Sequence, residues 1–287
     1  MPVTAAQVQA YASKLNGLKR EAIGLTNTAR VEVNKVTEAH RVRIKDMIDS
    51  RIKDDGKITL SELPPLRDSI KAEMDSMLDE VNDVLAAQKK AAFDLAVSKT
   101  QELAGLDLGG DAMFFSPSTD LLVISSEFTA DYVKSISSQF MAEVNVTLGR
   151  TAAGGMQPYE AMRKIDQIIG KTGAQGVSYQ AERVVRTEVH RIYSATLDSQ
   201  FTKFAEQLVK PGAVKKKWVS GPFRPGRREN HQDMDGETVG INERFSNGLM
   251  YPGDPQGAPE ETINCGCTWI LDAESVTQGV LETIEEL

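Results

Sequence analysis

The feature that most constrains the fold is a long repeat of apolar residues near the start of the chain. From Tyr11 to Ala29 these residues recur at alternating spacings of four and three, and the pattern resumes between Val33 and Met47. Such spacing places apolar side chains on one face of an amphipathic helix. The sequence therefore predicts a long helix whose apolar face needs a partner.

A second long helix is predicted after a turn-rich stretch over residues 53–57. Ser61 and Pro64-Pro65 supply cap and first-turn signals, and a similar apolar stripe runs from Ile70 toward Leu103. A short connection favours an antiparallel helical hairpin or bundle. A self-associating coiled coil, and hence a homo-oligomer, is the alternative.

The connection between these helices superficially resembles an EF-hand calcium loop. Arg51 and Lys53 would occupy its first two ligand positions, where a cation repels Ca²⁺. We therefore interpret the segment as a helix–helix turn.

The rest of the chain predicts further helices followed by a mixed segment. Helical spacing covers residues 129–148, stops at Gly154-Gly155, resumes at Pro158 and continues over 179–208; β-like pieces occupy 217–219 and 268–271. We expect a mainly α protein with a small C-terminal α+β domain. The expected parts are a helical hairpin that contacts a partner over 1–110, a helical part over 111–210, and the α+β part over 211–287.

Charge and hydropathy exclude some classes of protein. The 287 residues carry a formal net charge of −8, which argues against a surface built wholly to coat nucleic acid. Charged residues between Lys14 and Glu21 interrupt any signal-peptide core, and nowhere do 18 apolar residues run together. We expect a protein made in a host cytoplasm, with no membrane partner.

The most distinctive residues lie in the last third of the chain and follow one another in a definite order. They are Arg186-Thr187-Glu188 with Arg191, Lys217-Trp218, Arg228-x-x-His231-x-x-Met234-Asp235-Gly236, Phe245, Pro252-x-Asp254-Pro255 and Asn264-Cys265-x-Cys267.

This order and spacing resemble the Mu F family of phage head morphogenesis proteins over about residues 120–272. Gly266 stands where the family usually has arginine, so any role of that arginine is in doubt here. The resemblance implies a minor head protein of the virion head that acts by binding in head morphogenesis, DNA packaging or DNA delivery. The implied partners are portal, major capsid or scaffold proteins and packaged DNA.

Several motif residues suggest contacts of their own. Glu188 and Arg191 are three apart on a helix and can pair, although such a surface pair stabilises little, so we expect them to reach toward the β-rich segment. Arg186 and Glu188 point to different sides. Asp235-Gly236 predicts a hairpin tip.

His231, Cys265 and Cys267 form a candidate Zn²⁺ site, with His190 or Asp233 as a fourth ligand. Structural zinc sites favour Cys-x-x-Cys, so our main expectation is a domain without a cofactor, in which buried cysteines pack beside a hydrogen-bonded histidine. A Cys-x-Cys pair is also poorly suited to a disulfide.

A catalytic alternative makes Cys265 or Cys267 a nucleophile activated by His231 and oriented by Glu188 or Asn264, as in a thiol hydrolase; a zinc hydrolase is the related option. The chain has three histidines and no glycine-rich phosphate loop, so we do not expect an enzyme. Mu F-type domains also occur joined to toxin modules. Because twenty residues follow Cys267, we expect no such module here.

Charge placement adds a candidate contact surface. The acidic C-terminal end of the chain can neutralise a basic segment within one domain, or the basic segment can contact DNA phosphates or an acidic partner. DNA contact would fit an internal head protein ejected with the genome. The basic residues are Lys210, Lys215, Lys216, Lys217, Arg224, Arg227 and Arg228.

Overall fold

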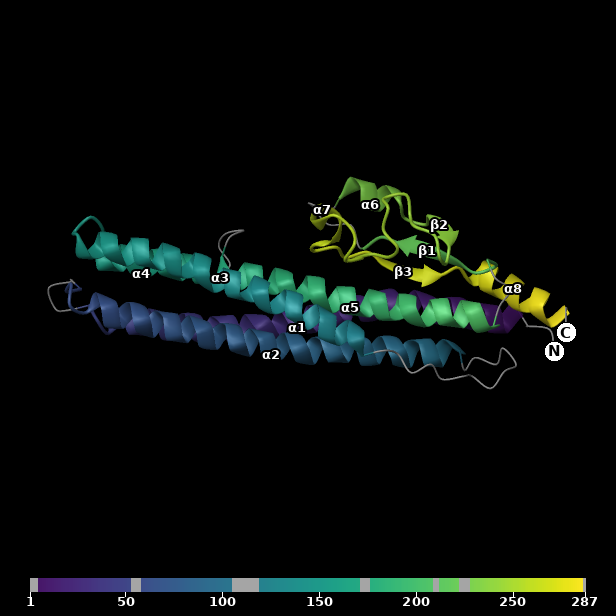
Figure 1. The fold of residues 1–287 in the computed structure, drawn as a ribbon, viewed down its shortest axis with the longest axis horizontal. Helices are drawn as coiled ribbons and strands as arrows, with labels where there is room; N and C mark the ends of the chain where they lie inside the picture. The colour runs from purple at the N-terminus through teal and green to yellow at the C-terminus, as the bar shows by residue number, and fades with distance from the viewer. Residues whose placement is uncertain are drawn as a thin grey trace. The chain divides into compact units, whose positions relative to one another are not determined.

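The computed structural model describes residues 5–52, 58–104, 119–170, 176–208, 212–221 and 228–285. Long helices dominate them, and a small antiparallel sheet lies near the C-terminal end (Figure 1). The predicted fold class is therefore confirmed. The elements are α1 (Ala5–Asp49), α2 (Leu63–Ala104), α3 (Asp120–Ala152), α4 (Pro158–Ile169), α5 (Val177–Leu208), β1 (Lys215–Val219), α6 (Glu229–Asp233), β2 (Thr238–Gly240), α7 (Pro259–Thr262), β3 (Thr268–Leu271) and α8 (Ala273–Glu285).

The chain divides into two compact units that cut across the long helices. We call Thr28–Ala87 with Ser126–Arg186 the helical unit, and Met1–Asn27 with Gln88–Ser125 and Thr187–Leu287 the mixed unit. Each unit thus combines segments that are distant in sequence. This division differs from the consecutive segments 1–110, 111–210 and 211–287 expected from the sequence.

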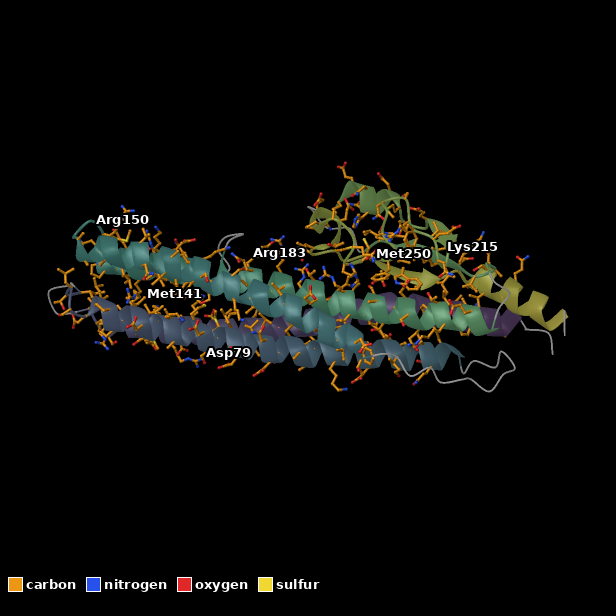
Figure 2. All side chains as sticks on the ribbon, viewed as in Figure 1. Asp79, Met141, Arg150, Arg183, Lys215 and Met250 are labelled. Atoms are coloured by element: carbon orange, nitrogen blue, oxygen red, sulfur yellow. The ribbon has the colours of Figure 1, made fainter. Side chains whose placement is uncertain are left out.

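In the helical unit, α1 and α2 bury the predicted apolar stripes. Val33, Ile44 and Ile70 are fully buried, while Asp79 on α2 and Arg150 on α3 are exposed (Figure 2). The end of α3 at Ala152 and the start of α4 at Pro158 follow the predicted glycine break. The apolar periodicity therefore positions these helices.

One buried histidine in the α1 stripe was not predicted. His40 is fully buried, with Nδ1 2.6 Å from an oxygen of Glu73 and Nε2 3.1 Å from an oxygen of Glu80 on α2. The sequence could not place these carboxylates, because both belong to a helix whose register against α1 is set only by packing.

Ion pairs show that α1 and α2 run antiparallel in the mixed unit. Lys14 pairs with Glu102 at 2.9 Å, and Glu21, later in α1, pairs with Lys99, earlier in α2, at 2.9 Å. The predicted antiparallel pair is confirmed. The segment that resembles a calcium loop, residues 53–57, lies outside the described residues.

The sheet of the mixed unit has the order β2-β1-β3, with antiparallel neighbours. Side chains alternate across β1, so Lys216 and Trp218 share the buried face. In the register with β3, Trp218 lies opposite Trp269. Both tryptophans are fully buried and anchor the core of this unit.

No helix among the described residues is long and apolar enough to cross a membrane.

The Arg41–Asp166 pair joins α1 to α4 in the helical unit and gives a test of this packing. Arg41 donates to both oxygens of Asp166, at 2.7 and 2.9 Å, which holds the pKa of this carboxyl below its usual range. Asp166→Asn should lower the free energy of unfolding at pH 7 by about 1 kcal/mol. Urea denaturation measures this difference.

The difference should depend on pH in one direction. Because the folded-state pKa of Asp166 is lowered, its contribution is complete above the unfolded pKa of about 4 and is lost as the pH falls through the folded value. Glu38→Gln removes the more exposed partner of Arg41 and serves as the control. A deficit of the Asp166 variant that persists unchanged at pH 2 would contradict the pairing.

Candidate metal centre

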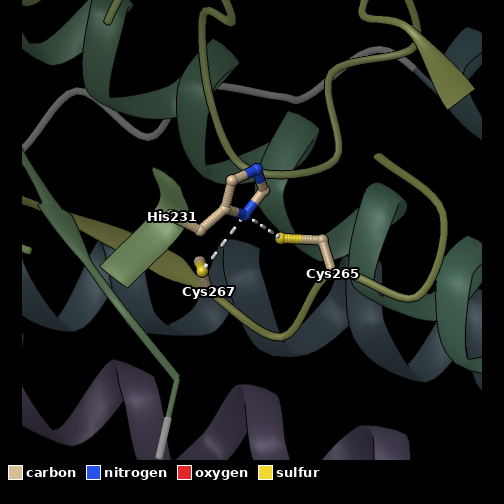
Figure 3. A group of neighbouring side chains, drawn as sticks. All are labelled: His231, Cys265 and Cys267. Carbon is tan, nitrogen blue, oxygen red and sulfur yellow. Dashed lines mark hydrogen bonds between the residues drawn. The ribbon is translucent and has the colours of Figure 1, made fainter. Parts of the chain in front are cut away.

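Three potential metal ligands from two segments meet inside the mixed unit. His231 lies on α6, and Cys265 and Cys267 lie in the segment between α7 and β3. His231 Nδ1 is 3.5 Å from Cys265 Sγ and 3.6 Å from Cys267 Sγ (Figure 3). All three side chains are buried, and both cysteines are free of disulfides.

The outer face of the imidazole is held by a carboxylate. Glu261 on α7 contacts His231 Nε2 at 2.6 Å and also accepts hydrogen bonds from the Asn230 amide, at 3.1 Å to each of its oxygens. In the neutral imidazole a carboxylate at Nε2 favours the tautomer with its proton there, so the lone pair of Nδ1 faces the two sulfurs; in the protonated ring Nδ1 donates to them instead. Glu261 was not predicted from the sequence. Its signal, an acidic residue four positions before Cys265, becomes informative only once α6 is placed.

The two thiols are electrostatically distinct. Hydrogen bonds from Cys265, from His231 and from the Gly221 backbone lower the pKa of Cys267 despite its burial. The same Cys265–Cys267 hydrogen bond, together with burial, raises the pKa of Cys265. Burial lowers the pKa of His231, but its bonds to Cys267 and Glu261 outweigh this effect and raise it. The cluster therefore favours a thiolate on Cys267.

Neither fourth ligand suggested by the sequence joins this group. Among the described residues the cluster contains His231, Cys265 and Cys267 alone. Asp233 is exposed at the end of α6. His190 lies on α5, and its ring is next to Gly253: a Cβ added to this glycine would lie 3.5 Å from the ring. The predicted use of either residue as the fourth ligand was wrong.

The predicted catalytic orientation also differs from the structure. Glu188 binds Arg191 at 2.6 Å, and the Asn264 backbone N–H donates to Thr187 Oγ1 at 3.0 Å. The group that orients His231 is Glu261. Neither Glu188 nor Asn264 therefore orients His231, as the prediction of a cysteine nucleophile had required.

Arg191 contacts the β-rich part of the chain as predicted. Its Nε donates to the Gly253 carbonyl at 3.2 Å while Nη1 pairs with Glu188. Arg228 makes a similar contact, from Nη2 to the Ile263 carbonyl at 2.7 Å. Within the helical unit Arg186 lies 3.5 Å from Glu182, one turn earlier on α5. Arg191 and Arg228 thus fix loop carbonyls, whereas Arg186 pairs within its own helix.

Asp254 organises the loop between β2 and α7. Its carboxylate accepts the backbone N–H groups of Met250 and Gln256, each at 2.9 Å, and lies 3.4 Å from Arg244. Gly253 supplies the positive φ of 85° that this turn requires. Pro255 is exposed beside it. The Pro-x-Asp-Pro motif therefore stabilises the turn of this loop.

Asp235 and Gly236 do not form a hairpin tip. Gly236 adopts a φ of 86° and its N–H donates to the Trp218 carbonyl at 2.9 Å, which continues the pairing of β1 toward α6. Asp235 accepts the Ser220 N–H at 2.7 Å. The prediction was wrong because α6 lies in the long connection between β1 and β2, where local turn signals do not report on pairing.

Two lysines of the basic segment make contacts inside the mixed unit rather than facing solvent freely. Lys217 pairs with Asp272 at 2.8 Å, which agrees with attraction between the basic and acidic regions. Lys216 is fully buried, and burial lowers its pKa although Asp198 and Asp254 oppose the shift. Because its side chain is not exposed, Lys216 cannot contact DNA phosphates.

The remaining basic residues divide by position. Lys215 is exposed at the start of β1, and Arg228 is partly buried. Lys210, Arg224 and Arg227 lie outside the described residues. Lys216 was misassigned because the run of three lysines suggested one solvated face, whereas strand alternation turns the middle lysine inward.

Comparison with known proteins gives partial relatives only. No protein-family model and no solved structure matches the chain. It is 34% identical over 95 residues to uncharacterized protein YqbB of Bacillus subtilis (strain 168), covering 31% of this chain and 30% of that protein. It is 34% identical over 100 residues to NAD(+)–arginine ADP-ribosyltransferase EFV of Enterococcus faecalis (strain ATCC 700802 / V583), covering 34% of this chain and 20% of that protein. The chain thus matches less than a third of either relative.

The Asp254 loop gives a test of the structural role of the motif. Asp254→Ala removes the buried carboxylate that accepts the Met250 and Gln256 N–H groups, so the free energy of unfolding should fall by about 1–3 kcal/mol. Chemical denaturation followed by tryptophan fluorescence measures it. Asp233→Ala removes an exposed carboxylate and should change stability little. Equal stability of the two variants would refute the role of Asp254.

Proposed function

We propose that this protein is a minor component of a tailed-phage head, similar to Mu F-like head morphogenesis proteins, and that it acts by binding. The observation that carries the proposal is the ordered set of motifs from Arg186 to Cys267, which resembles that family. The proposed location is the virion head, at or near the portal.

The placement of the motif side chains supports a binding role. Arg191, Arg228 and Asp254 bind backbone groups of neighbouring loops, and His231 is enclosed by two thiols and a carboxylate. These groups are committed to internal contacts, so they hold the mixed unit together. Recognition of other head proteins then belongs to its outer surface and to the long helices.

The helical unit offers a surface suited to protein contacts. On α1, Val31 and Val42 are 45% and 49% exposed and lie eleven residues apart, close to three full turns, so they share one face. An amphipathic helix with exposed apolar side chains fits a hydrophobic groove on a partner. We assign this face to contacts with portal, capsid or scaffold subunits.

Each relative matches only a domain-sized part of this chain. Sequence shared with YqbB and with the ADP-ribosyltransferase is about 100 residues long, a typical domain size. Function depends on the site rather than on the fold, and the match covers only 20% of the transferase, so it does not make this chain an enzyme. We propose that it lacks ADP-ribosyltransferase activity. Transfer from labelled NAD⁺ to an arginine substrate would overturn this part of the proposal.

Mass spectrometry of purified particles tests the main proposal. The chain should be present in procapsids and virions in far fewer copies than the major capsid protein. Comparison of full virions with particles emptied of DNA separates the rivals, since a structural head protein stays with the emptied shell and an ejected DNA-binding protein leaves with the genome. Absence from both procapsids and virions would sink the proposal.

Variants of the exposed α1 face make the test specific. Val31→Glu with Val42→Glu should reduce incorporation into procapsids several-fold without altering the melting temperature, because a buried charge at an interface is costly. Ala39→Glu adds a charge at an exposed α1 position without removing an exposed valine, and it is the matched control. Equal incorporation of the double variant and the control would exclude α1 as the contact surface.

A further inference from the structure

We propose that His231 Nδ1 and the sulfurs of Cys265 and Cys267 bind one Zn²⁺ ion, which fastens α6 to the segment before β3. This inference does not depend on the proposed phage function. It rests on the positions of the three ligand atoms, on the carboxylate behind the imidazole, and on the backbone that carries the cysteines.

The spacing of the ligand atoms matches a tetrahedral zinc centre. With Zn–S bonds of about 2.3 Å and Zn–N bonds of about 2.0–2.1 Å, nitrogen and sulfur ligands lie about 3.5–3.6 Å apart. The two Nδ1–Sγ distances are 3.5 and 3.6 Å, and all three ligand atoms lie within 4.8 Å of one another.

Glu261 completes the arrangement found around zinc-bound histidines. Such a histidine donates its second ring N–H to a carboxylate or carbonyl, which fixes the ring and makes the ligating nitrogen more basic. The 2.6 Å contact between Glu261 and His231 Nε2 provides this support. The Asn230 amide holds the same carboxylate in place.

The backbone explains how a Cys-x-Cys pair serves one metal. Asn264 adopts a left-handed conformation with a φ of 60° just before the first cysteine, and β3 begins directly after Cys267. Both sulfurs face His231 Nδ1, at 3.5 and 3.6 Å.

Burial favours this ligand set. Two thiolates neutralise the charge of Zn²⁺, and a neutral cluster costs far less to bury than an isolated ion. Trp218 packs edge-on against the His231 ring at 5.3 Å and shields the centre. The described residues supply three ligands. We assign the fourth tetrahedral position to a water molecule.

The decisive experiment measures metal in the full-length protein. Purified without chelators, it should contain about one zinc ion per chain by inductively coupled plasma mass spectrometry. Replacement by Co²⁺ should give the visible bands of four-coordinate cobalt and near-ultraviolet thiolate charge-transfer bands. Since Cys265 and Cys267 are the only cysteines, those bands can arise only from this site.

Matched variants then separate ligands from neighbours. Cys265→Ser and Cys267→Ser should abolish the charge-transfer bands of the lost sulfur and reduce bound zinc. Glu261→Gln keeps all three ligands and should weaken zinc binding about 10–100-fold. Asp233→Asn, an exposed carboxylate on the same α6, should bind zinc as the wild type does.

Thermal unfolding supplies a readout that does not depend on metal retention during purification. A chelator should lower the melting temperature of the wild type, and added zinc should restore it. If the serine variants do not fold, cobalt spectra of the wild type and the Glu261→Gln affinity still decide the question. Wild-type protein with well below one zinc per chain, no thiolate–cobalt bands and no response to added zinc would overturn the proposal.

Discussion

The packing of Trp218 is the interaction on which the mixed unit depends. Its indole meets the His231 ring at 5.3 Å and the Phe245 ring at 5.1 Å, both edge-on. Its backbone N–H donates to Glu237 and its carbonyl accepts from Gly236, at 2.8 and 2.9 Å. One strand residue therefore joins β1, α6 and the loop after β2 around a single buried side chain.

Periodicity predicted most of the helical architecture because apolar spacing reports directly on which helix face is buried. Leu18, Ala29 and Ile44, all in the predicted stripe, are buried as expected. His40 and its two carboxylates escaped prediction, because their meeting depends on the register between α1 and α2. Local pattern thus predicts elements, and packing determines which polar groups they bring together.

The candidate site was predicted only in part, because its residues are far apart in the sequence and are brought together by folding. His231, Cys265 and Cys267 were grouped correctly, because few residue types can ligate a metal and their order resembled a family motif. Glu261 was missed, and Asp233 and His190 were wrongly included, because residue type does not reveal which side of α6 faces the loop. The prediction that Lys216 contacts DNA or a partner was wrong for a similar reason: three consecutive lysines hide the two-residue alternation of a strand, which buries the middle one.

The concentration of polar anchors follows from the small size of the sheet. Strands of five, three and four residues bury little surface of their own, and a sheet this small needs support from packing. Arg191, Arg228 and Asp254 each tie an irregular loop to a fixed backbone group, and His231 ties α6 to the cysteine segment. The residues that resemble a family signature are therefore those that a short-stranded fold needs to hold its loops. Because these side chains are occupied inside the unit, they stabilise its loops rather than its outer surface.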